Sequence, residues 1–136
     1  MSYKYMSPCI NTKNIDKSRD FYLKYFNAKV IFDCGWYLNL RFSNAVSAIE
    51  LCFMSPQNEL CKYFSGEGLT YNFQVDNVDL EFERLSGKGL IPVVPLNNHP
   101  WGDRGFAVQD PNGIIIYIFT PIEPDGEFKK FYKENK

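Results

Sequence analysis

The sequence predicts an α+β protein made of two tandem βαβββ modules, with curved, mostly antiparallel sheets around a cavity. A repeat is the first observation behind this fold class. Asn14-Ile15-Asp16 recurs 63 positions later, from 14 to 77, as Asn77-Val78-Asp79. Each copy links a short alternating strand to a helix with periodic apolar side chains, and each half of the chain ends in a strand hairpin. The length of 136 residues suits a single duplicated domain.

The first module is predicted over residues 3–54. Its opening strand near Cys9 leads to a helix that presents one mainly aromatic face. The residues of this face are Ser18, Phe21, Tyr22 and Tyr25. Three strands are expected to follow, with a turn at Ser43-Asn44 between the last two. Their ranges are 28–32, 36–42 and 48–54.

A linker with one helical turn near Leu60 and Phe64 is expected over residues 55–68. The second module is predicted over 69–122, and its helix ends near Gly87. Its remaining strands are expected at 91–95, 104–109 and 114–120.

The last two strands should turn through Asp110-Pro111-Asn112-Gly113, because proline presets φ and Gly113 accepts a positive φ. The tail, residues 123–136, has an aromatic stripe at helical spacing. It predicts a short amphipathic helix that packs on the body or on a partner subunit. The stripe consists of Phe128, Phe131 and Tyr132.

Composition excludes several classes of function. Fifteen Lys+Arg against sixteen Asp+Glu give a net charge of −1, so we expect no nucleic-acid partner. The longest apolar run, 114–119, is too short to span a bilayer, so we expect no membrane partner. The single histidine, His99, excludes sites that need two histidine ligands. It lies in an Asn-Asn-His-Pro sequence and is interpreted as a surface-loop residue.

The four cysteines favour a reduced, cytoplasmic protein. None of them forms a CxxC pair, and the N-terminal sequence is too polar for a signal peptide. We expect buried free thiols. They are Cys9, Cys34, Cys52 and Cys61.

Two segments within the paired βαβββ pattern carry a family resemblance. N-I-D-K-S-R-D-F-Y opens the first helix, and P-W-G-D-R-G-F-A-V-Q-D-P-N-G lies near the end. With the duplication, they resemble the vicinal oxygen chelate superfamily, the glyoxalase/bleomycin resistance protein/dioxygenase family, over residues 5–122. The resemblance implies that family's fold. It places the family's metal ligands on Ser7, Glu50, Thr70 and Tyr117. Only Glu50 is a good ligand, so we expect no cofactor and no divalent metal.

Strand alternation then assigns the residues that face the cavity. Glu50, Asn72 and Tyr117 should point inward, and pairing around the hairpin turn should place Phe106 beside Tyr117. The predicted ligand-binding set is polar and aromatic. It comprises Tyr37, Asn39, Arg41, Glu50, Asn72, Trp101, Arg104, Phe106 and Tyr117. The alternative is packing, in which Arg41 pairs with Glu50 and Trp101 belongs to an interface.

The resemblance and the predicted lining favour a metal-independent small-molecule-binding protein of the glyoxalase/bleomycin-resistance type. Such a protein would act as a homodimer and sequester a small toxic or antibiotic-like organic ligand. The alternative is a glyoxalase-like lyase, isomerase or dioxygenase that uses Glu50 as a metal ligand or as a general base with a raised pKa. A third reading is an accessory module without a ligand of its own.

Overall fold

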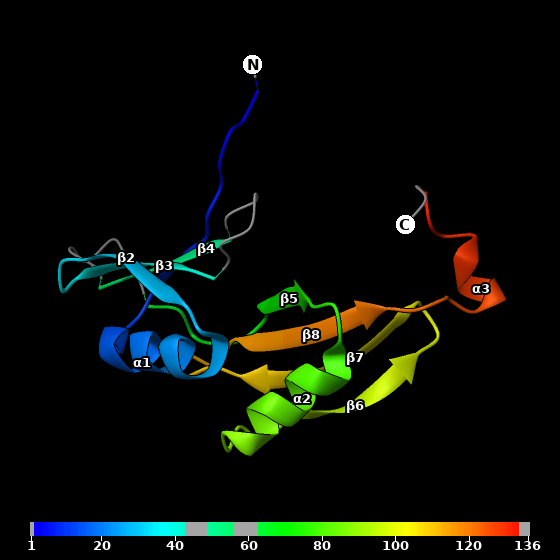
Figure 1. Cartoon of the computed structure of the whole chain (residues 1–136). Helices are drawn as coiled ribbons and strands as arrows, with labels where there is room; N and C mark the ends of the chain where they lie inside the picture. The colour runs from blue at the N-terminus through cyan, green and yellow to red at the C-terminus, as the bar shows by residue number, and fades with distance from the viewer. Residues whose placement is uncertain (1, 43–48, 56–62, 134–136) are drawn as a thin grey trace. The chain divides into compact units, whose positions relative to one another are not determined.

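The computed structural model describes residues 2–42, 49–55 and 63–133. The chain forms two compact units, each drawn in Figure 1. Unit 1 consists of Met1–Glu67 and Asp110–Gly113, and unit 2 consists of Gly68–Gln109 and Ile114–Lys136. The predicted Ser43-Asn44 turn, Leu60 and Cys61 lie outside the described residues.

Unit 1 carries a four-stranded sheet with one helix on it. Its elements are β1 (Cys9–Asn11), α1 (Ile15–Phe26), β2 (Lys29–Asp33), β3 (Tyr37–Arg41) and β4 (Glu50–Met54). The strand order is β1-β4-β3-β2, and only the β1–β4 pair is parallel. Tyr22 of α1 is fully buried, and its ring centroid lies 5.6 Å from that of Phe53 in β4. One face of the sheet therefore packs on α1; we call the opposite face the distal face of unit 1.

The turn at Asp110–Gly113 belongs to unit 1, although the sequence pattern assigns it to the second module. The Tyr22 hydroxyl donates a hydrogen bond of 2.7 Å to Asp110 Oδ2. Asn112 Nδ2 donates to Ser18 Oγ at 3.0 Å. The positive φ expected at Gly113 is confirmed at 88°. Side-chain hydrogen bonds to α1 thus fix this turn in the core of unit 1.

Unit 2 repeats the arrangement. Its elements are β5 (Thr70–Gln74), α2 (Val78–Gly87), β6 (Val94–His99), β7 (Asp103–Gln109), β8 (Ile115–Pro121) and α3 (Gly126–Lys129). The strand order is β5-β8-β7-β6, and only the β5–β8 pair is parallel. Figure 1 shows α2 along one face of this sheet. Phe106 is buried against Phe82 of α2 with ring centroids 5.1 Å apart, so the opposite face is the distal face of unit 2. The predicted α+β fold of two βαβββ modules is confirmed.

Strand β6 lies later than the predicted 91–95 and extends to His99. Its register pairs His99 with Asp103, so the chain turns through only three residues, 100–102. Gly102 has a φ of 116°, which allows this tight turn. The segment expected to be a loop is therefore the end of a strand.

The register of β7 and β8 also differs from the prediction. Phe106 lies opposite Ile118, and Tyr117 lies opposite Ala107. The connecting loop includes Ile114, which is buried and precedes β8. The sequence prediction starts this strand one residue earlier, at Ile114. That difference of one residue shifts the pairing, so the predicted partners lie on opposite faces of the sheet.

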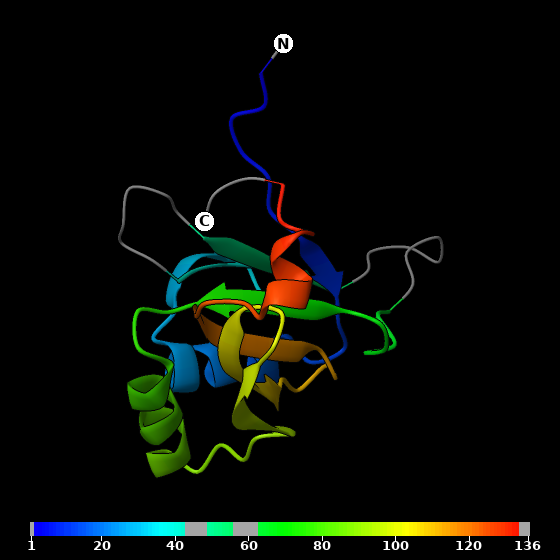
Figure 2. The same cartoon turned by 90° about the vertical axis from the view of Figure 1, so that its right-hand side faces the viewer.

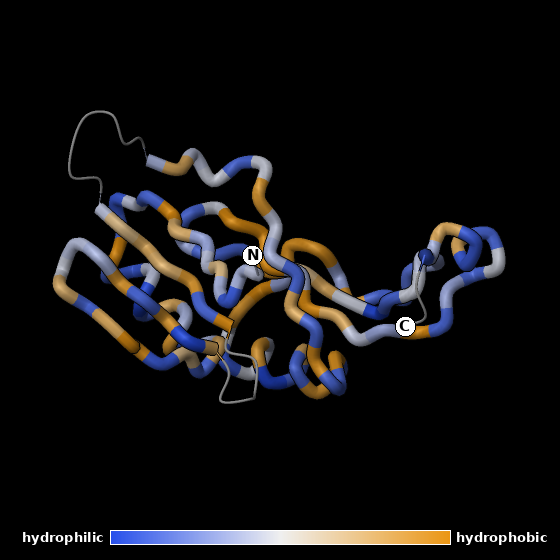
Figure 3. The backbone as a smooth tube through the Cα atoms, turned by 90° about the horizontal axis from the view of Figure 1, so that it is seen from above, coloured by the Kyte–Doolittle hydropathy of each residue, from blue (hydrophilic) through white to orange (hydrophobic). Residues whose placement is uncertain are grey.

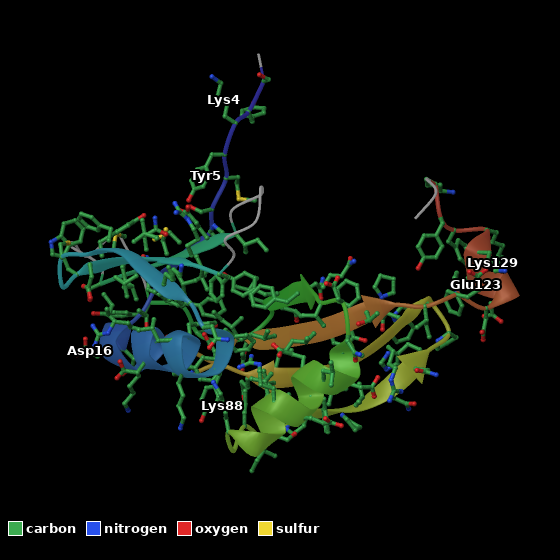
Figure 4. All side chains as sticks on the ribbon, viewed as in Figure 1. Lys4, Tyr5, Asp16, Lys88, Glu123 and Lys129 are labelled. Atoms are coloured by element: carbon green, nitrogen blue, oxygen red, sulfur yellow. The ribbon has the colours of Figure 1, made fainter. Side chains whose placement is uncertain are left out.

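The tail is less helical than predicted. Figure 2 shows α3 as one short helix after β8, and its residues are 126–129. Phe131 is exposed, and Lys129 pairs with Glu123 at 2.7 Å, both labelled in Figure 4. The tail nevertheless contacts the β6–β7 turn of unit 2, because the Tyr132 hydroxyl donates to the backbone carbonyl of Trp101.

The cysteine prediction is corrected in part. Cys52 is a buried free thiol, but Cys9 and Cys34 are free and exposed. Among the described residues, no helix is long and apolar enough to cross a membrane. Figure 3 shows hydrophilic and hydrophobic residues following one another in short stretches.

Candidate functional site

Three side chains surround the carboxylate of Glu50 on the distal face of unit 1. The antiparallel register of β3 and β4 places Arg41 opposite Glu50. Asn39 is two residues before Arg41 and therefore shares its face. Tyr5 reaches the same carboxylate from the N-terminal segment, where Figure 4 labels it. We call Tyr5, Asn39, Arg41 and Glu50 the Glu50 cluster.

Both oxygens of Glu50 accept hydrogen bonds within this cluster. Tyr5 Oη donates to Oε1 at 2.6 Å, and Asn39 Nδ2 donates to the same oxygen at 3.0 Å. Arg41 donates to Oε2 through Nε at 3.1 Å and through Nη2 at 2.9 Å. The Arg41–Glu50 pair that the sequence offered as an alternative is therefore present. The carboxylate is fully engaged, since four donors share its two oxygens.

These contacts decide the protonation of Glu50. The Tyr5 hydrogen bond, followed by those of Asn39 and Arg41, lowers the pKa of Glu50 from 4.5 to about 2. The expectation of a pKa raised by burial is therefore wrong, although the side chain is only 8% exposed. A carboxylate that binds a proton so weakly is a poor general base at neutral pH.

A second row of polar side chains continues the distal face of unit 1. Tyr37 lies beside Cys52; a hydrogen bond to Cys52, with burial, raises the pKa of the Tyr37 hydroxyl to about 12. Ser7 Oγ lies 3.7 Å from Cys52 Sγ. Tyr37 and Ser7 thus present neutral hydroxyls near the Glu50 cluster.

The residues present do not fit a divalent metal. The positions to which the resemblance assigns the family's metal ligands hold, in unit 1, Ser7 and the fully hydrogen-bonded Glu50. In unit 2 they hold Thr70 and Tyr117, and burial raises the pKa of the Tyr117 hydroxyl. Within residues 2–42, 49–55 and 63–133, no group of three or more His, Cys, Asp and Glu side chains could hold a metal ion. Neutral hydroxyls are weak ligands, so we derive no chemistry through a metal.

Unit 2 carries a second cluster on its distal face, centred on Asp103. His99 Nδ1 lies 2.9 Å from Asp103 Oδ1, and Trp101 Nε1 donates to Oδ2 at 2.6 Å. The Tyr117 hydroxyl donates to Oδ1. We call His99, Trp101, Asp103 and Tyr117 the Asp103 cluster. The interpretation of His99 as a surface-loop residue is wrong, because it ends β6 and its side chain is only 18% exposed.

Gly105 is needed beneath this cluster. A Cβ at this position would lie 2.5 Å from the Tyr117 hydroxyl oxygen and 2.8 Å from the Ile118 carbonyl oxygen. Burial and the hydrogen bond to Asp103 raise the pKa of Tyr117, so its hydroxyl stays protonated and acts as a donor. The absent side chain of Gly105 therefore leaves space for the Tyr117 ring end.

The structure places the predicted binding residues in several locations. Four lie together on the distal face of unit 1, namely Tyr37, Asn39, Arg41 and Glu50. Trp101 and Tyr117 belong to the Asp103 cluster, and Asn72 is an exposed residue paired with Tyr117 across β5 and β8.

Arg104 and Phe106 were predicted to belong to this set, but the structure places them elsewhere. Arg104 Nη2 donates to Asp79 of α2 at 2.8 Å, and Phe106 is buried against the same helix. Both side chains therefore lie on the α2 face, because the true register reverses the predicted one.

Sequence reasoning missed the pairing of His99 with Asp103. The signal was available in the tight turn, because Gly102 permits a three-residue connection that brings residues 99 and 103 opposite each other.

Unit 1 also has a hollow of about 350 Å³ at the N-terminal end of α1. Lys13 lines it, with its ammonium 4.9 Å from the centroid of the Tyr63 ring. None of the residues predicted to bind a ligand lines this hollow.

Comparison with known families gives one match. The model of a glyoxalase-like domain matches residues 5–123. No curated protein matches the chain.

Several solved structures share the fold. A glyoxalase/bleomycin resistance protein/dioxygenase from Nocardioides is 17% identical with a TM-score of 0.74, covering 90% of this chain and 87% of its own. TnmS3, an antibiotic binding protein from a Streptomyces species, is 21% identical with a TM-score of 0.69 and coverages of 89% and 98%. A lactoylglutathione lyase from Agrobacterium tumefaciens is 14% identical with a TM-score of 0.67 and coverages of 88% and 94%. At these identities the likeness shows the fold alone.

Proposed function

Because the chain belongs to the glyoxalase-like domain family, we propose that it is a metal-independent protein that binds and sequesters a small organic ligand. The ligand contacts the polar and aromatic side chains on the distal face of unit 1 and is released unchanged. The family contains both binding proteins and enzymes, so the choice between these two functions has to rest on the chemistry of the site. The fold shared with TnmS3, an antibiotic binding protein, supports an antibiotic-like ligand.

One observation carries this proposal: the state of Glu50. Tyr5, Asn39 and Arg41 saturate its oxygens and lower its pKa to about 2. A metal or a substrate proton would have to displace charged hydrogen bonds to reach it. Glu50 therefore acts as a fixed anion that orients its neighbours.

Arg41 is the neighbour that a ligand can contact. Its side chain is 41% exposed, while Nε and Nη2 are held by Glu50. The guanidinium is thus fixed in orientation and still reaches solvent. A fixed planar donor of this kind suits a carbonyl or carboxylate of an organic ligand.

We expect a homodimer as the working assembly. Strand β2 is an edge strand of its sheet, and all five of its residues are exposed. Val30, Ile31 and Phe32 in this strand are large and apolar. Exposed apolar edges of this kind favour association with a second copy. Light scattering of the purified chain and of Phe32→Glu tests this; a monomeric wild-type protein would contradict it.

Calorimetric titration with bleomycin and a panel of planar antibiotics tests the function. We expect binding of at least one compound, without turnover, by protein purified without chelators and containing substoichiometric metal. The Arg41→Gln variant should weaken this binding. Arg19→Gln is the matched control, because Arg19 lies on α1 and pairs with Asp33.

Three results would overturn the proposal. The first is stoichiometric nickel, zinc, manganese or iron in the purified protein. The second is conversion of a hemithioacetal to a thioester. The third is equal binding by the Arg41→Gln and wild-type proteins.

A further inference from the structure

The Asp103 cluster contains a histidine with only one of its two ring nitrogens engaged. His99 Nδ1 lies 2.9 Å from Asp103 Oδ1 and 2.9 Å from the Tyr117 hydroxyl oxygen. Nε2 has no hydrogen-bond partner in the part of the chain that the structure describes. The imidazole is therefore held from one side, while the side chain is 18% exposed.

A count of protons fixes which nitrogen of His99 carries hydrogen. The carboxylate of Asp103 can only accept hydrogen bonds, and Tyr117 uses its single proton to donate to it. The Tyr117 oxygen can then only accept from His99. Both neighbours of Nδ1 thus require an N–H there, and the neutral ring keeps a lone pair on Nε2.

Trp101 holds the same ring from its face. The indole and imidazole centroids lie 4.6 Å apart, and the ring planes differ by 2°. The indole is itself anchored, because Nε1 donates to Asp103 Oδ2. Hydrogen bonds and stacking therefore restrict the imidazole of His99 to one orientation.

We propose that His99 Nε2 is a hydrogen-bond acceptor for a small organic ligand on unit 2, and that this ligand carries a phenolic hydroxyl or a comparable N–H donor. Gly105 and Ala107 on the same sheet face are buried, and the Tyr117 ring end fills the space at Gly105. A donor of the ligand therefore approaches Nε2 from solvent and not across these two residues. This inference rests on the proposed ligand-binding function and names the class of ligand.

The tautomer is tested without any ligand. The chain has one histidine, so a long-range ¹H–¹⁵N spectrum of the imidazole reports on His99 alone. In the neutral imidazole we expect the proton on Nδ1 and the lone pair on Nε2. Asp103→Ala removes the carboxylate acceptor and should abolish this preference, whereas Tyr117→Phe, which keeps the carboxylate, should preserve it. A wild-type protein whose neutral imidazole carries its proton on Nε2, or an unchanged Asp103→Ala spectrum, would overturn the inference.

The ligand class is tested with 2-naphthol and 2-methoxynaphthalene, which share a ring system and differ in the donor. We expect the wild-type protein to bind 2-naphthol about tenfold more tightly, the value of one good hydrogen bond. The Nε2 resonance should shift with 2-naphthol only. His99→Phe keeps a ring for Trp101 but lacks the acceptor, so both probes should then bind equally weakly.

Equal binding of the two probes by the wild-type protein, or no binding of either, would refute this ligand class. The proposed function would fail separately, through bound metal or catalytic turnover. The two failures are therefore distinguishable.

Discussion

Replacing Glu50 by glutamine should destabilise unit 1 in a pH-dependent way. The pKa of Glu50 is lowered from 4.5 to about 2, first by Tyr5 and then by Asn39 and Arg41. Each tenfold change in proton affinity corresponds to about 1.4 kcal/mol, so the upper limit is roughly 3 kcal/mol. Arg41 is 41% exposed, and solvent weakens its attraction for Glu50. We therefore expect a loss of about 1–2 kcal/mol at pH 7.

The sign of the pH dependence follows from the lowered pKa. The folded protein holds Glu50 ionised more strongly than the unfolded chain does. The stabilisation is thus fully present above the unfolded pKa of about 4.5 and is lost as the pH falls through about 2. The difference in unfolding free energy between wild type and Glu50→Gln should shrink over this range.

Urea denaturation followed by circular dichroism at pH 7, 4 and 2.5 measures this difference. Glu83→Gln is the matched control, because Glu83 is an exposed residue of α2. The control should change stability by less than about 0.5 kcal/mol at each pH. A Glu50→Gln variant as stable as wild type at pH 7, or a difference that grows on acidification, would refute the reasoning.

Three further changes test the packing within each unit. Tyr22→Phe leaves buried Asp110 without one donor, so urea denaturation should show that the free energy of unfolding falls by about 1.5–3 kcal/mol. A variant as stable as wild type would show that this hydrogen bond is dispensable. Gly105→Ala places a Cβ against the Tyr117 hydroxyl. We expect the free energy of unfolding to fall by about 1–3 kcal/mol and the imidazole resonance of His99 to shift, and an unchanged spectrum would contradict this. Deleting residues 124–136 removes backbone contacts to unit 2 and should lower the melting temperature, whereas an unchanged value would argue against tail packing.

The repeated modules could be read from the sequence because their signals are local. The helix that presents Ser18 and Tyr22 on one face is confirmed as α1, with both residues buried. The positive φ at Gly113 follows from its place in the Asp-Pro-Asn-Gly turn sequence. Such features depend on a few neighbouring residues, so they need no knowledge of the rest of the chain.

The candidate site was predictable only where the strand register was correct. Arg41 and Glu50 were expected on one face, and they form the Glu50 cluster. Arg104 and Phe106 were expected beside Tyr117, but they lie on the α2 face. The lowered pKa of Glu50 required Tyr5, whose approach from the N-terminal segment has no signature in the sequence.

The sequence by itself determined the βαβββ duplication, the glycine turns and the residue types at the four positions that the resemblance assigns to metal ligands. These depend on residue identity and short-range periodicity. Tertiary structure alone decided which face each strand residue occupies and which side chains meet. Burial of Ile114 sets the β7–β8 register, and the β6–β7 turn brings His99 to Asp103. Both outcomes depend on long-range pairing, because a strand of alternating side chains fits two registers that differ by one residue.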